Sequence, residues 1–228
     1  MGGAVTGNPT PVTVWAVVVA AGDGSRFGGL KQFVEIGGRP MVDWSVDAAR
    51  SVADGVVLVV PGEVARPASP GAPDAHGADV VTAGGATRTE SVRAGLRAVP
   101  PDAEVIVVHD GARPLASAAL FRSVVDAVRS GSGGAVPALA LSDTVKRVDD
   151  TGAVLGTVAR DGLVTVQTPQ AFRADLLRRA HAAGGEATDD AALVEAQGAT
   201  VRVVPGDPRN LKVTTPADLD MARNLVGR

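Results

Sequence analysis

The sequence contains no cysteine and no tyrosine among its 228 residues, and aromatic residues make up only 3% of it. Without cysteine the chain has neither disulfides nor thiolate metal ligands, which is compatible with a cytoplasmic location. The few aromatic rings leave little surface for stacking on bases, and a net charge of −3 gives no basic stripe. We therefore expect no binding to nucleic acid.

Long apolar runs are also missing from the sequence. No segment approaches the roughly twenty residues of a membrane-spanning helix, and residues 1–13 lack the charged and apolar regions of a signal peptide. The hydrophobic content of 45% is nevertheless enough for a sizeable core. We expect a cytoplasmic protein without membrane contact, in which a flexible tail at 1–13 precedes one domain over 14–228.

Lysine is scarce as well, since only Lys31, Lys146 and Lys212 occur among the 22 basic residues. A GC-rich coding sequence explains the general preference for arginine, but it leaves the three lysines to be explained. An ammonium is a compact point charge that a planar guanidinium does not replace where a single phosphate oxygen must be reached. The lysines are therefore candidates for phosphate contacts, with chance placement as the alternative.

What the sequence does contain is a regular alternation of strand and helix patterns. Apolar runs predict strands at 14–20, 55–60, 78–82, 104–108, 134–140, 163–167 and 200–204. Helical patterns fall at 40–52, 89–98, 117–129, 173–183, 189–197 and 216–226, with Ser117 and Thr188 as candidate caps. This order predicts a doubly wound α/β sheet with right-handed crossovers.

Two stretches interrupt the alternation. Residues 61–77 hold four prolines without apolar periodicity and predict an irregular surface connection. Residues 142–160 predict a polar hairpin that turns at Asp149–Gly152. Because the edges of such a hairpin are otherwise unpaired, we expect a second subunit to cover this arm.

Residues 14–32 join a buried strand to a glycine-rich turn that carries Arg26 and Lys31. The glycines let backbone N–H groups approach an anion, so we expect this turn to bind a polyphosphate. The Walker A pattern is absent, and Phe27 stands where the dinucleotide fingerprint requires its third glycine. An ordinary strand-to-helix turn remains the alternative.

Further polar residues follow the ends of later strands. Asp110 ends a buried strand and is a candidate Mg²⁺ ligand beside a triphosphate, or else a residue that only orders the turn. We expect the neighbouring His109 to be a hydrogen-bonded support, whereas His76 and His181 stand alone in the sequence. Gly84 and Gly85 offer a backbone approach to a nucleotide base, although a cap at Thr87 or Thr89 explains that segment equally well. Thr168, Thr188 and Lys212 are candidates for an anion pocket, or for caps and turns.

Seven segments together resemble the 2-C-methyl-D-erythritol 4-phosphate cytidylyltransferase family. In order they are AAGDGSRFGGLKQF, GGATRTESV, HDGARP, SDTVK, ARDGLVTVQTPQAF, TDDAALVE and NLKVTTPADL. The resemblance implies a Rossmann-like nucleotidyltransferase fold and a homodimer joined through the hairpin arm. It also implies Mg²⁺-dependent transfer of CMP from CTP to a sugar-alcohol phosphate in non-mevalonate isoprenoid precursor biosynthesis.

The resemblance also assigns site residues by position. The catalytic residues are Arg26, Lys31, Arg160 and Lys212, and Asp110 binds the metal; the CTP-binding residues are Ala20, Ala21, Gly22, Gly24, Gly85 and Ser91; the acceptor pocket has Arg113, Thr144, Thr168 and Thr188. The sequence departs from the family pattern in the short spacing between Arg26 and Lys31, in Gly111, and in the proline-rich 61–77 connection.

Three other functions remain open at this point. A ribitol 5-phosphate cytidylyltransferase uses the same chemistry, but the alanines of AAGDG favour the methylerythritol enzyme, since we expect glycines there in the ribitol enzyme. A non-catalytic nucleotide-binding module would have no reason to keep Arg26, Lys31 and Asp110 together. The displaced third glycine disfavours a dinucleotide-dependent oxidoreductase.

Overall fold

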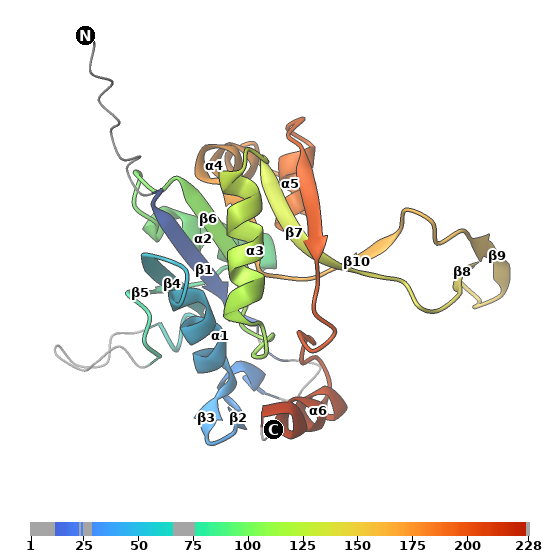
Figure 1. The fold of residues 1–228 in the computed structure, drawn as a ribbon. Coiled ribbons are helices and arrows are strands. Elements are labelled where there is room, and N and C mark those ends of the chain that lie inside the picture. The colour runs from blue at the N-terminus through green and yellow to red at the C-terminus, as the bar shows by residue number, and fades with distance from the viewer. Residues whose placement is uncertain (1–11, 23, 25–28, 66–75, 227–228) are drawn as a thin grey trace, which may run out of the picture.

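The structure, a computed structural model, describes residues 12–22, 24, 29–65 and 76–226 (Figure 1). Its centre is an eight-stranded sheet in the order β10-β7-β11-β6-β1-β4-β5, with β12 also paired to β7. The strands are β1 (Val14–Val19), β4 (Gly55–Val60), β5 (Val80–Ala83), β6 (Val105–Asp110), β7 (Gly134–Ala140), β10 (Val164–Val166), β11 (Gln170–Arg173) and β12 (Val201–Pro205). A second, two-stranded sheet joins β2 (Glu35–Ile36) to β3 (Arg39–Pro40).

The first half of the sheet agrees with the predicted alternation of strands and helices. β1 lies between β4 and β6, and β5 adds to β4, with all of these pairs parallel. All residues of β4 and β6 are buried, because helices cover both faces of a parallel sheet. The α/β fold class is therefore confirmed, and the parallel strands place the ends of β1 and β6 at one edge.

The second half of the sheet corrects the prediction. β11 was not predicted, and it runs antiparallel to both β6 and β7. β10 is antiparallel to β7 as well. Only residues 167–169 separate β10 from β11, and this connection is far too short for a helical crossover. The two strands therefore run in the same direction along β7, one after the other, with a break between them. The interruption places Thr168 at the edge where β6 ends.

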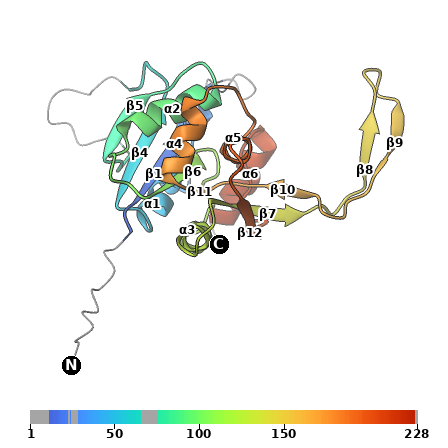
Figure 2. The ribbon, with the colours of Figure 1, turned by 90° about the horizontal axis from the view of Figure 1, so that it is seen from above.

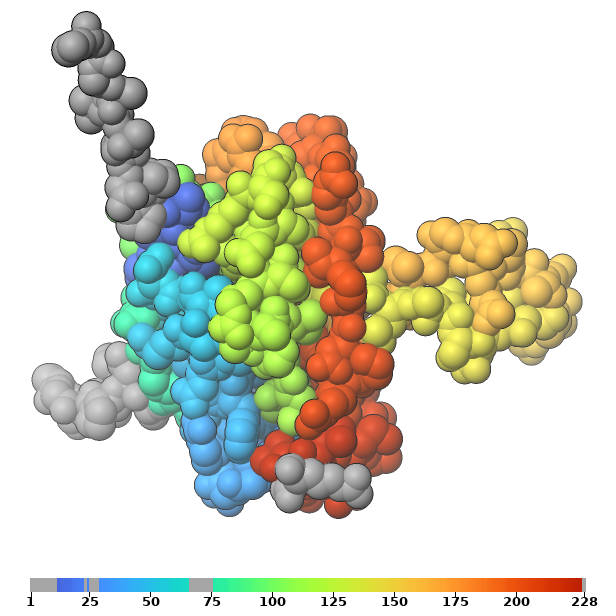
Figure 3. All heavy atoms as spheres, in the orientation of Figure 1, coloured from blue at the N-terminus to red at the C-terminus, as the bar shows by residue number. Residues whose placement is uncertain are grey.

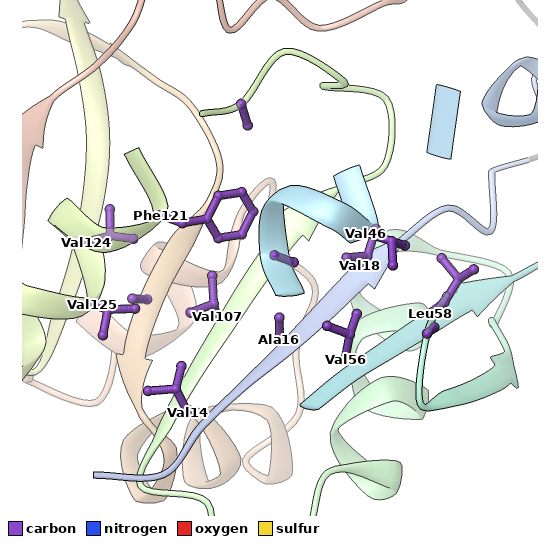
Figure 4. Close-up of a cluster of buried hydrophobic side chains, with 14 of the residues drawn as sticks. Val14, Ala16, Val18, Val46, Val56, Leu58, Val107, Phe121, Val124 and Val125 are labelled. Atoms are coloured by element: carbon purple, nitrogen blue, oxygen red, sulfur yellow. The ribbon is translucent and has the colours of Figure 1, made fainter. Parts of the chain in front are cut away.

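Helices form a layer on each face of the sheet (Figures 1 and 2). On one face, α1 (Met41–Arg50) and α3 (Ala118–Arg129) pack on β1, β4 and β6 in the cluster that Figure 4 shows around Val18 and Phe121. The other face carries α2 (Arg88–Ala98), α4 (Ala174–Ala182) and α5 (Asp190–Glu195). A separate cluster joins α6 (Pro216–Val226) to Ile36 of β2.

Capping side chains decide where several of these helices begin. Ser117 caps α3 as predicted, and its Oγ accepts a hydrogen bond from the Leu120 amide over 3.2 Å. Thr87 and Glu90 form a capping box at the start of α2. The prediction of Thr188 as a cap is wrong, because the adjacent Asp189 accepts from the Ala192 amide over 3.1 Å. The Thr188 side chain is thus available for another role.

The predicted hairpin is present as β8 (Val145–Val148) and β9 (Val154–Val158), which pair only with each other in the described part of the chain. Figures 2 and 3 show that this arm projects away from the body. Asp149 fixes its turn by accepting hydrogen bonds from the amides of Thr151 and Ala153, each over 2.9 Å.

Two of the predicted segments are described only in part. Residues 1–11 of the predicted tail and residues 66–75 of the proline-rich connection lie outside the described residues. Thr13, however, accepts hydrogen bonds on its carbonyl from the amides of Glu104 and Val105.

No helix in the described ranges combines the length and the apolar character that crossing a bilayer requires.

Candidate active site

The glycine-rich turn after β1 is held by a buried glutamine. Gln32 Nε2 donates to the carbonyls of Ala20 and Gly22 over 2.8 and 3.1 Å. Gly24 has a φ of +66°, and a Cβ there would lie only 1.7 Å from the carbonyl oxygen of Gly29. The turn therefore requires glycine at this point. Arg26 and Gly28 lie outside the described residues, so their phosphate contacts remain a prediction.

A second loop, between β5 and α2, approaches this turn closely. A Cβ on Gly84 would lie 2.3 Å from Cβ of Ala21 and 2.7 Å from Oγ of Ser91, so a larger residue would push the loops apart. Ser91 Oγ accepts from the Gly85 amide over 3.2 Å and donates to the Thr87 carbonyl over 2.9 Å. The residues predicted to contact CTP thus lie on two loops in mutual contact and, in the case of Ser91, in the first turns of α2.

Asp110, at the end of β6, is the centre of an ion-pair network. Its Oδ2 accepts from Lys212 Nζ over 2.8 Å, and its Oδ1 accepts from Arg88 Nε over 3.2 Å. Arg88 Nη1 also donates to Asp190 over 2.8 Å. Burial alone would raise the pKa of Asp110, but Arg88 and Lys212 attract its charged form and lower this pKa below its ordinary value. The carboxylate is therefore ionised throughout the physiological range.

A directed chain of hydrogen bonds runs behind Asp110. The Asp110 amide donates to Thr168 Oγ1 over 3.0 Å, so the Thr168 hydroxyl can donate to His109 Nδ1 over 3.1 Å. His109 Nε2 then donates to the Arg113 carbonyl over 3.2 Å. This order requires a neutral imidazole with its proton on Nε2, and burial lowers the pKa of His109 to about 4. His109 is thus the hydrogen-bonded support that the sequence predicted.

Asn210 positions the segment that carries Lys212. This fully buried side chain donates from Nδ2 to the Thr168 carbonyl over 2.8 Å. The backbone carbonyl of Asn210 accepts from Arg113 Nη1 over 2.7 Å. Burial lowers the pKa of Arg113, whose Nε is buried without a hydrogen-bond partner among the described residues.

Two adjacent cavities open onto this network. The larger, of about 630 Å³, is called the loop cavity here and is lined by Val19, Ala21, Gly22, Lys31, Gln32, Gly85, Ala86, Thr87, Arg88, Ser91, Asp110, Ala112 and Lys212. The smaller, of about 120 Å³, is called the threonine cavity and is lined by Arg88, Asp110, Arg113, Val166, Gln167, Thr168, Gln170, Thr188, Asp189 and Lys212. Arg88, Asp110 and Lys212 belong to both.

The two cavities divide the predicted residues into two groups. Five of the residues assigned to CTP or to its phosphates line the loop cavity: Ala21, Gly22, Lys31, Gly85 and Ser91. Three of the four acceptor residues line the threonine cavity, namely Arg113, Thr168 and Thr188. Ala20 is buried beneath the turn and Gly24 shapes it, but neither lines the loop cavity.

The remaining predicted residues lie elsewhere. Thr144 and Arg160 are exposed at the arm, and within the described part of the chain they line neither cavity. Arg160 Nη1 donates to the backbone carbonyls of Leu141 and Ser142. Of the three lysines, Lys31 and Lys212 reach the loop cavity, whereas Lys146 lies on the arm and donates to Thr157 over 2.6 Å.

Sequence reasoning left Arg88, Gln32 and Asp190 unassigned. Arg88 is the first residue of α2, directly after the capping residue Thr87. Its position shortly after Gly84 and Gly85 was the signal in the sequence that could have identified it as a site residue. Nothing in the sequence indicated that Asp190 would pair with Arg88, because 102 positions separate them. His181 stands alone in the sequence, but in space its Nε2 lies 3.0 Å from Asp190 Oδ1.

The chemistry of the loop cavity follows from its charges. Lys31, Arg88 and Lys212 line it against the single carboxylate of Asp110, which leaves an excess of positive charge. A glycine turn after one parallel strand and a carboxylate at the end of its neighbour mark the edge at which α/β sheets bind nucleotides. The fold and site therefore define a Rossmann-like protein with a positively charged cavity at this edge of the sheet.

Comparison with known proteins makes this more specific. The family model described as "IspD: 2-C-methyl-D-erythritol 4-phosphate cytidylyltransferase" matches residues 14–228. A relative with that enzyme name from Nocardia farcinica is 49% identical over 220 residues, which cover 95% of each chain. Another from Rhodococcus jostii is 48% identical over 218 residues, covering 93% of this chain and 95% of the relative.

A solved structure agrees with the sequence comparison. The crystal structure of 2-C-methyl-D-erythritol 4-phosphate cytidylyltransferase from Thermus thermophilus superposes with a TM-score of 0.77 at 37% identity. The match covers 93% of this chain and 98% of that one. The chain belongs to the 2-C-methyl-D-erythritol 4-phosphate cytidylyltransferase family, and it is an enzyme of the nucleotidyltransferase type.

Proposed function

We propose that the chain transfers CMP from CTP to 2-C-methyl-D-erythritol 4-phosphate, releasing pyrophosphate and forming 4-diphosphocytidyl-2-C-methyl-D-erythritol in non-mevalonate isoprenoid precursor biosynthesis. The observation that carries the proposal is the junction of the loop and threonine cavities at Arg88, Asp110 and Lys212. A triphosphate in one cavity and an acceptor phosphate in the other would meet at this shared wall. Joining two anions in this way needs alignment and neutralising charge.

The proposed reaction needs no enzymatic base. A phosphate monoester has a second pKa of about 6, so near pH 7 the acceptor is largely a dianion. One of its oxygens attacks the α-phosphorus of CTP, and the bond from that phosphorus to the bridging oxygen breaks as the new bond forms. The electron pair leaves with pyrophosphate. His109 suits this scheme, since its lowered pKa of about 4 and its two hydrogen bonds remove it as a proton carrier.

The lysines would supply charge at two points of the transfer. Lys31 follows the glycine turn and lines the loop cavity, where charge develops on the α-phosphate. Lys212 lies at the junction, and its ion pair with Asp110 at 2.8 Å holds it there before any ligand arrives. Arg26 is proposed to act beside Lys31 on the same phosphate.

We also propose that Mg²⁺ assists the reaction, with Asp110 as its protein ligand. The lowered pKa keeps this carboxylate charged, and Mg²⁺ commonly uses one carboxylate together with phosphate oxygens. Asp110 would share the ion with phosphate oxygens of the bound substrate. The described residues contain no cluster of three or more His, Cys, Asp or Glu side chains that could hold a metal ion without a ligand. When bound, the ion would neutralise the triphosphate; Arg88 and Lys212 would keep Asp110 oriented toward it.

A homodimer would account for the residues on the arm. Val148, Val154 and Leu155 are 51%, 62% and 63% exposed, which is unusual for apolar side chains on a projecting hairpin. We propose that these side chains pack on a second copy of the chain. Thr144 and Arg160 would then reach the threonine cavity of the partner and contact the acceptor there.

The acceptor is the point at which this proposal differs from its main alternative. The ribitol 5-phosphate enzyme is not favoured, since the family model and the curated relatives carry the methylerythritol name.

The proposed location of the protein is the cytoplasm, and the lack of cysteine is compatible with that location.

One assay tests the proposed function. Pyrophosphate release from CTP is measured with 2-C-methyl-D-erythritol 4-phosphate and with ribitol 5-phosphate in parallel reactions, with and without EDTA. We expect release with the first acceptor only, and none in EDTA. Faster release with ribitol 5-phosphate would overturn the acceptor assignment, and full activity in EDTA would overturn the metal.

A further inference from the structure

A third cavity lies away from the active site, between α2 and α4. It has a volume of about 370 Å³ and is lined by Arg93, Leu96, Arg97, Arg178, His181 and Ala182, and it is called the arginine pocket here. None of these residues belongs to the loop or threonine cavity. Three guanidinium groups and a histidine thus gather around a pocket to which no lining carboxylate contributes.

Two of the three arginines, Arg97 and Arg178, meet no carboxylate among the described residues. Arg178 donates to the carbonyls of Leu96, Val99 and Pro100, which end or follow α2, and its Nε is buried without a hydrogen-bond partner among the described residues. Arg97 is exposed and makes no hydrogen bond or ion pair within the described part of the chain.

Arg93 meets the nearest carboxylate. It donates to the carbonyls of His181 and Gly185, and its only carboxylate neighbour among the described residues is Glu186 at 3.9 Å, which is itself 56% exposed. Hydrogen bonds to carbonyls satisfy the donors of an arginine without cancelling its charge. The pocket therefore keeps a positive potential.

His181 adds an independent sign of a missing partner. Its side chain is only 3% exposed, and Nε2 lies 3.0 Å from Asp190 Oδ1. The other ring nitrogen, Nδ1, is buried and has no hydrogen-bond partner within the ranges that the structure describes. Buried polar atoms are rarely left unpaired in folded proteins, so each one needs an explanation.

His181 also connects the pocket to the active site. Asp190 accepts from His181 on one oxygen and from Arg88 Nη1, at 2.8 Å, on the other. Arg88 in turn contacts Asp110. A continuous series of polar contacts thus links the arginine pocket to the junction of the two substrate cavities.

We propose that the arginine pocket binds a small anion, a phosphate or carboxylate group, and that this anion strengthens CTP binding. The contacts from His181 through Asp190 to Arg88 are the route by which the bound anion would change the charge that Arg88 presents to the triphosphate. The coupling rests on the proposed CTP site, whereas binding of the anion does not.

Histidine NMR spectra test the binding because the chain has only three histidines, His76, His109 and His181. Inorganic phosphate is titrated into the ¹³C,¹⁵N-histidine-labelled protein without CTP. We expect a saturable shift of the His181 ring signals, with an affinity that Arg97→Glu weakens about tenfold or more. Arg122→Glu, the same charge change on the exposed outer face of α3, is the matched control and should bind normally.

Phosphate in the active site must be distinguished from phosphate in the pocket. Lys212→Ala removes a cation of both substrate cavities but touches no residue of the arginine pocket. The His181 response should therefore persist in Lys212→Ala and weaken in Arg97→Glu. No saturable His181 shift, or a shift lost in Lys212→Ala and kept in Arg97→Glu, would overturn the site.

The coupling is measured as the Kd of CTP with and without saturating phosphate, in the absence of acceptor. We expect phosphate to tighten CTP binding by about fivefold or more in the wild type and in Arg122→Glu, and to lose this effect in Arg97→Glu. Unchanged or weaker CTP binding in the wild type, with the His181 shift intact, would contradict the coupling alone. Failure to bind CTP in any condition would count against the proposed function.

Discussion

The body and the arm hold their predicted functional residues in opposite surroundings. Asp110 and Lys212 form an ion pair at the edge of the sheet where β6 ends, and the Asp110 side chain is 12% exposed. Thr144 and Arg160 are exposed, and Arg160 bonds to backbone carbonyls of its own arm. The body site is organised by contacts within one chain, whereas we propose that the arm finds its partner on a second chain.

The largest effect is expected at the centre of the body site. Asp110→Asn keeps the size of the side chain but removes the charge that Arg88 and Lys212 surround and that we propose to hold Mg²⁺. We expect kcat/KM to fall by about 10³-fold. Steady-state pyrophosphate release with varied Mg²⁺ measures it, and near-native activity in a folded variant would remove Asp110 from the site.

Loss of a single lysine beside the glycine turn should have the next largest effect. Lys31→Ala is expected to lower kcat by roughly 10²-fold with little change in unfolding free energy, since its charge acts on the transition state. Arg122→Ala on the outer face of α3 serves as control. If Lys31→Ala turned over at the wild-type rate, the lysine would have to be reassigned to the surface.

On the arm, a charge among the exposed apolar side chains Val148, Val154 and Leu155 should lower activity by preventing dimer formation. Leu155→Asp places a carboxylate where we propose that two chains pack, so we expect dissociation to monomers together with loss of most activity. Light scattering and the pyrophosphate assay report the two effects. Asp150→Asn, on the turn of the same arm, is the control. A fully active monomer would show that the body site needs no arm.

The smallest effect is expected in the pH dependence of the unfolding free energy. Burial lowers the pKa of His109 to about 4 in the folded chain, whereas the unfolded imidazole titrates near about 6.5. Between these values the unfolded state binds more protons, so the unfolding free energy should decrease as the pH falls from 7 to 4.5, by up to about 3 kcal/mol. Urea denaturation measures the slope. His109→Asn should reduce it, and an unchanged slope in this variant would refute the assignment.

The sequence predicted those parts of the molecule that depend on local patterns. Buried apolar runs located β1, β4 and β6, and the hydroxyl of Ser117 located the start of α3. Asp110 was found because it ends such a run. β11 was missed because four residues within a short polar segment give no apolar period, and only its pairing with β6 and β7 makes it a strand.

Contacts between distant segments could not be predicted in the same way. The pairing of Arg88 with Asp190 depends on how α2 and α5 pack on one face of the sheet. The link from Thr168 to His109 depends on the break between β10 and β11. Arg160 is a third case, because the role that we propose for it depends on a second chain.

Complementation between two inactive variants tests the central comparison most directly. Arg160→Ala and Lys212→Ala are mixed at equal concentration under conditions that permit subunit exchange. If the arm of one chain serves the body of the other, each mixed dimer has one intact site, and about a quarter of all sites should be active. A verified mixed dimer without activity would show that Arg160 and Lys212 act within one chain, or that Arg160 has no part in the site.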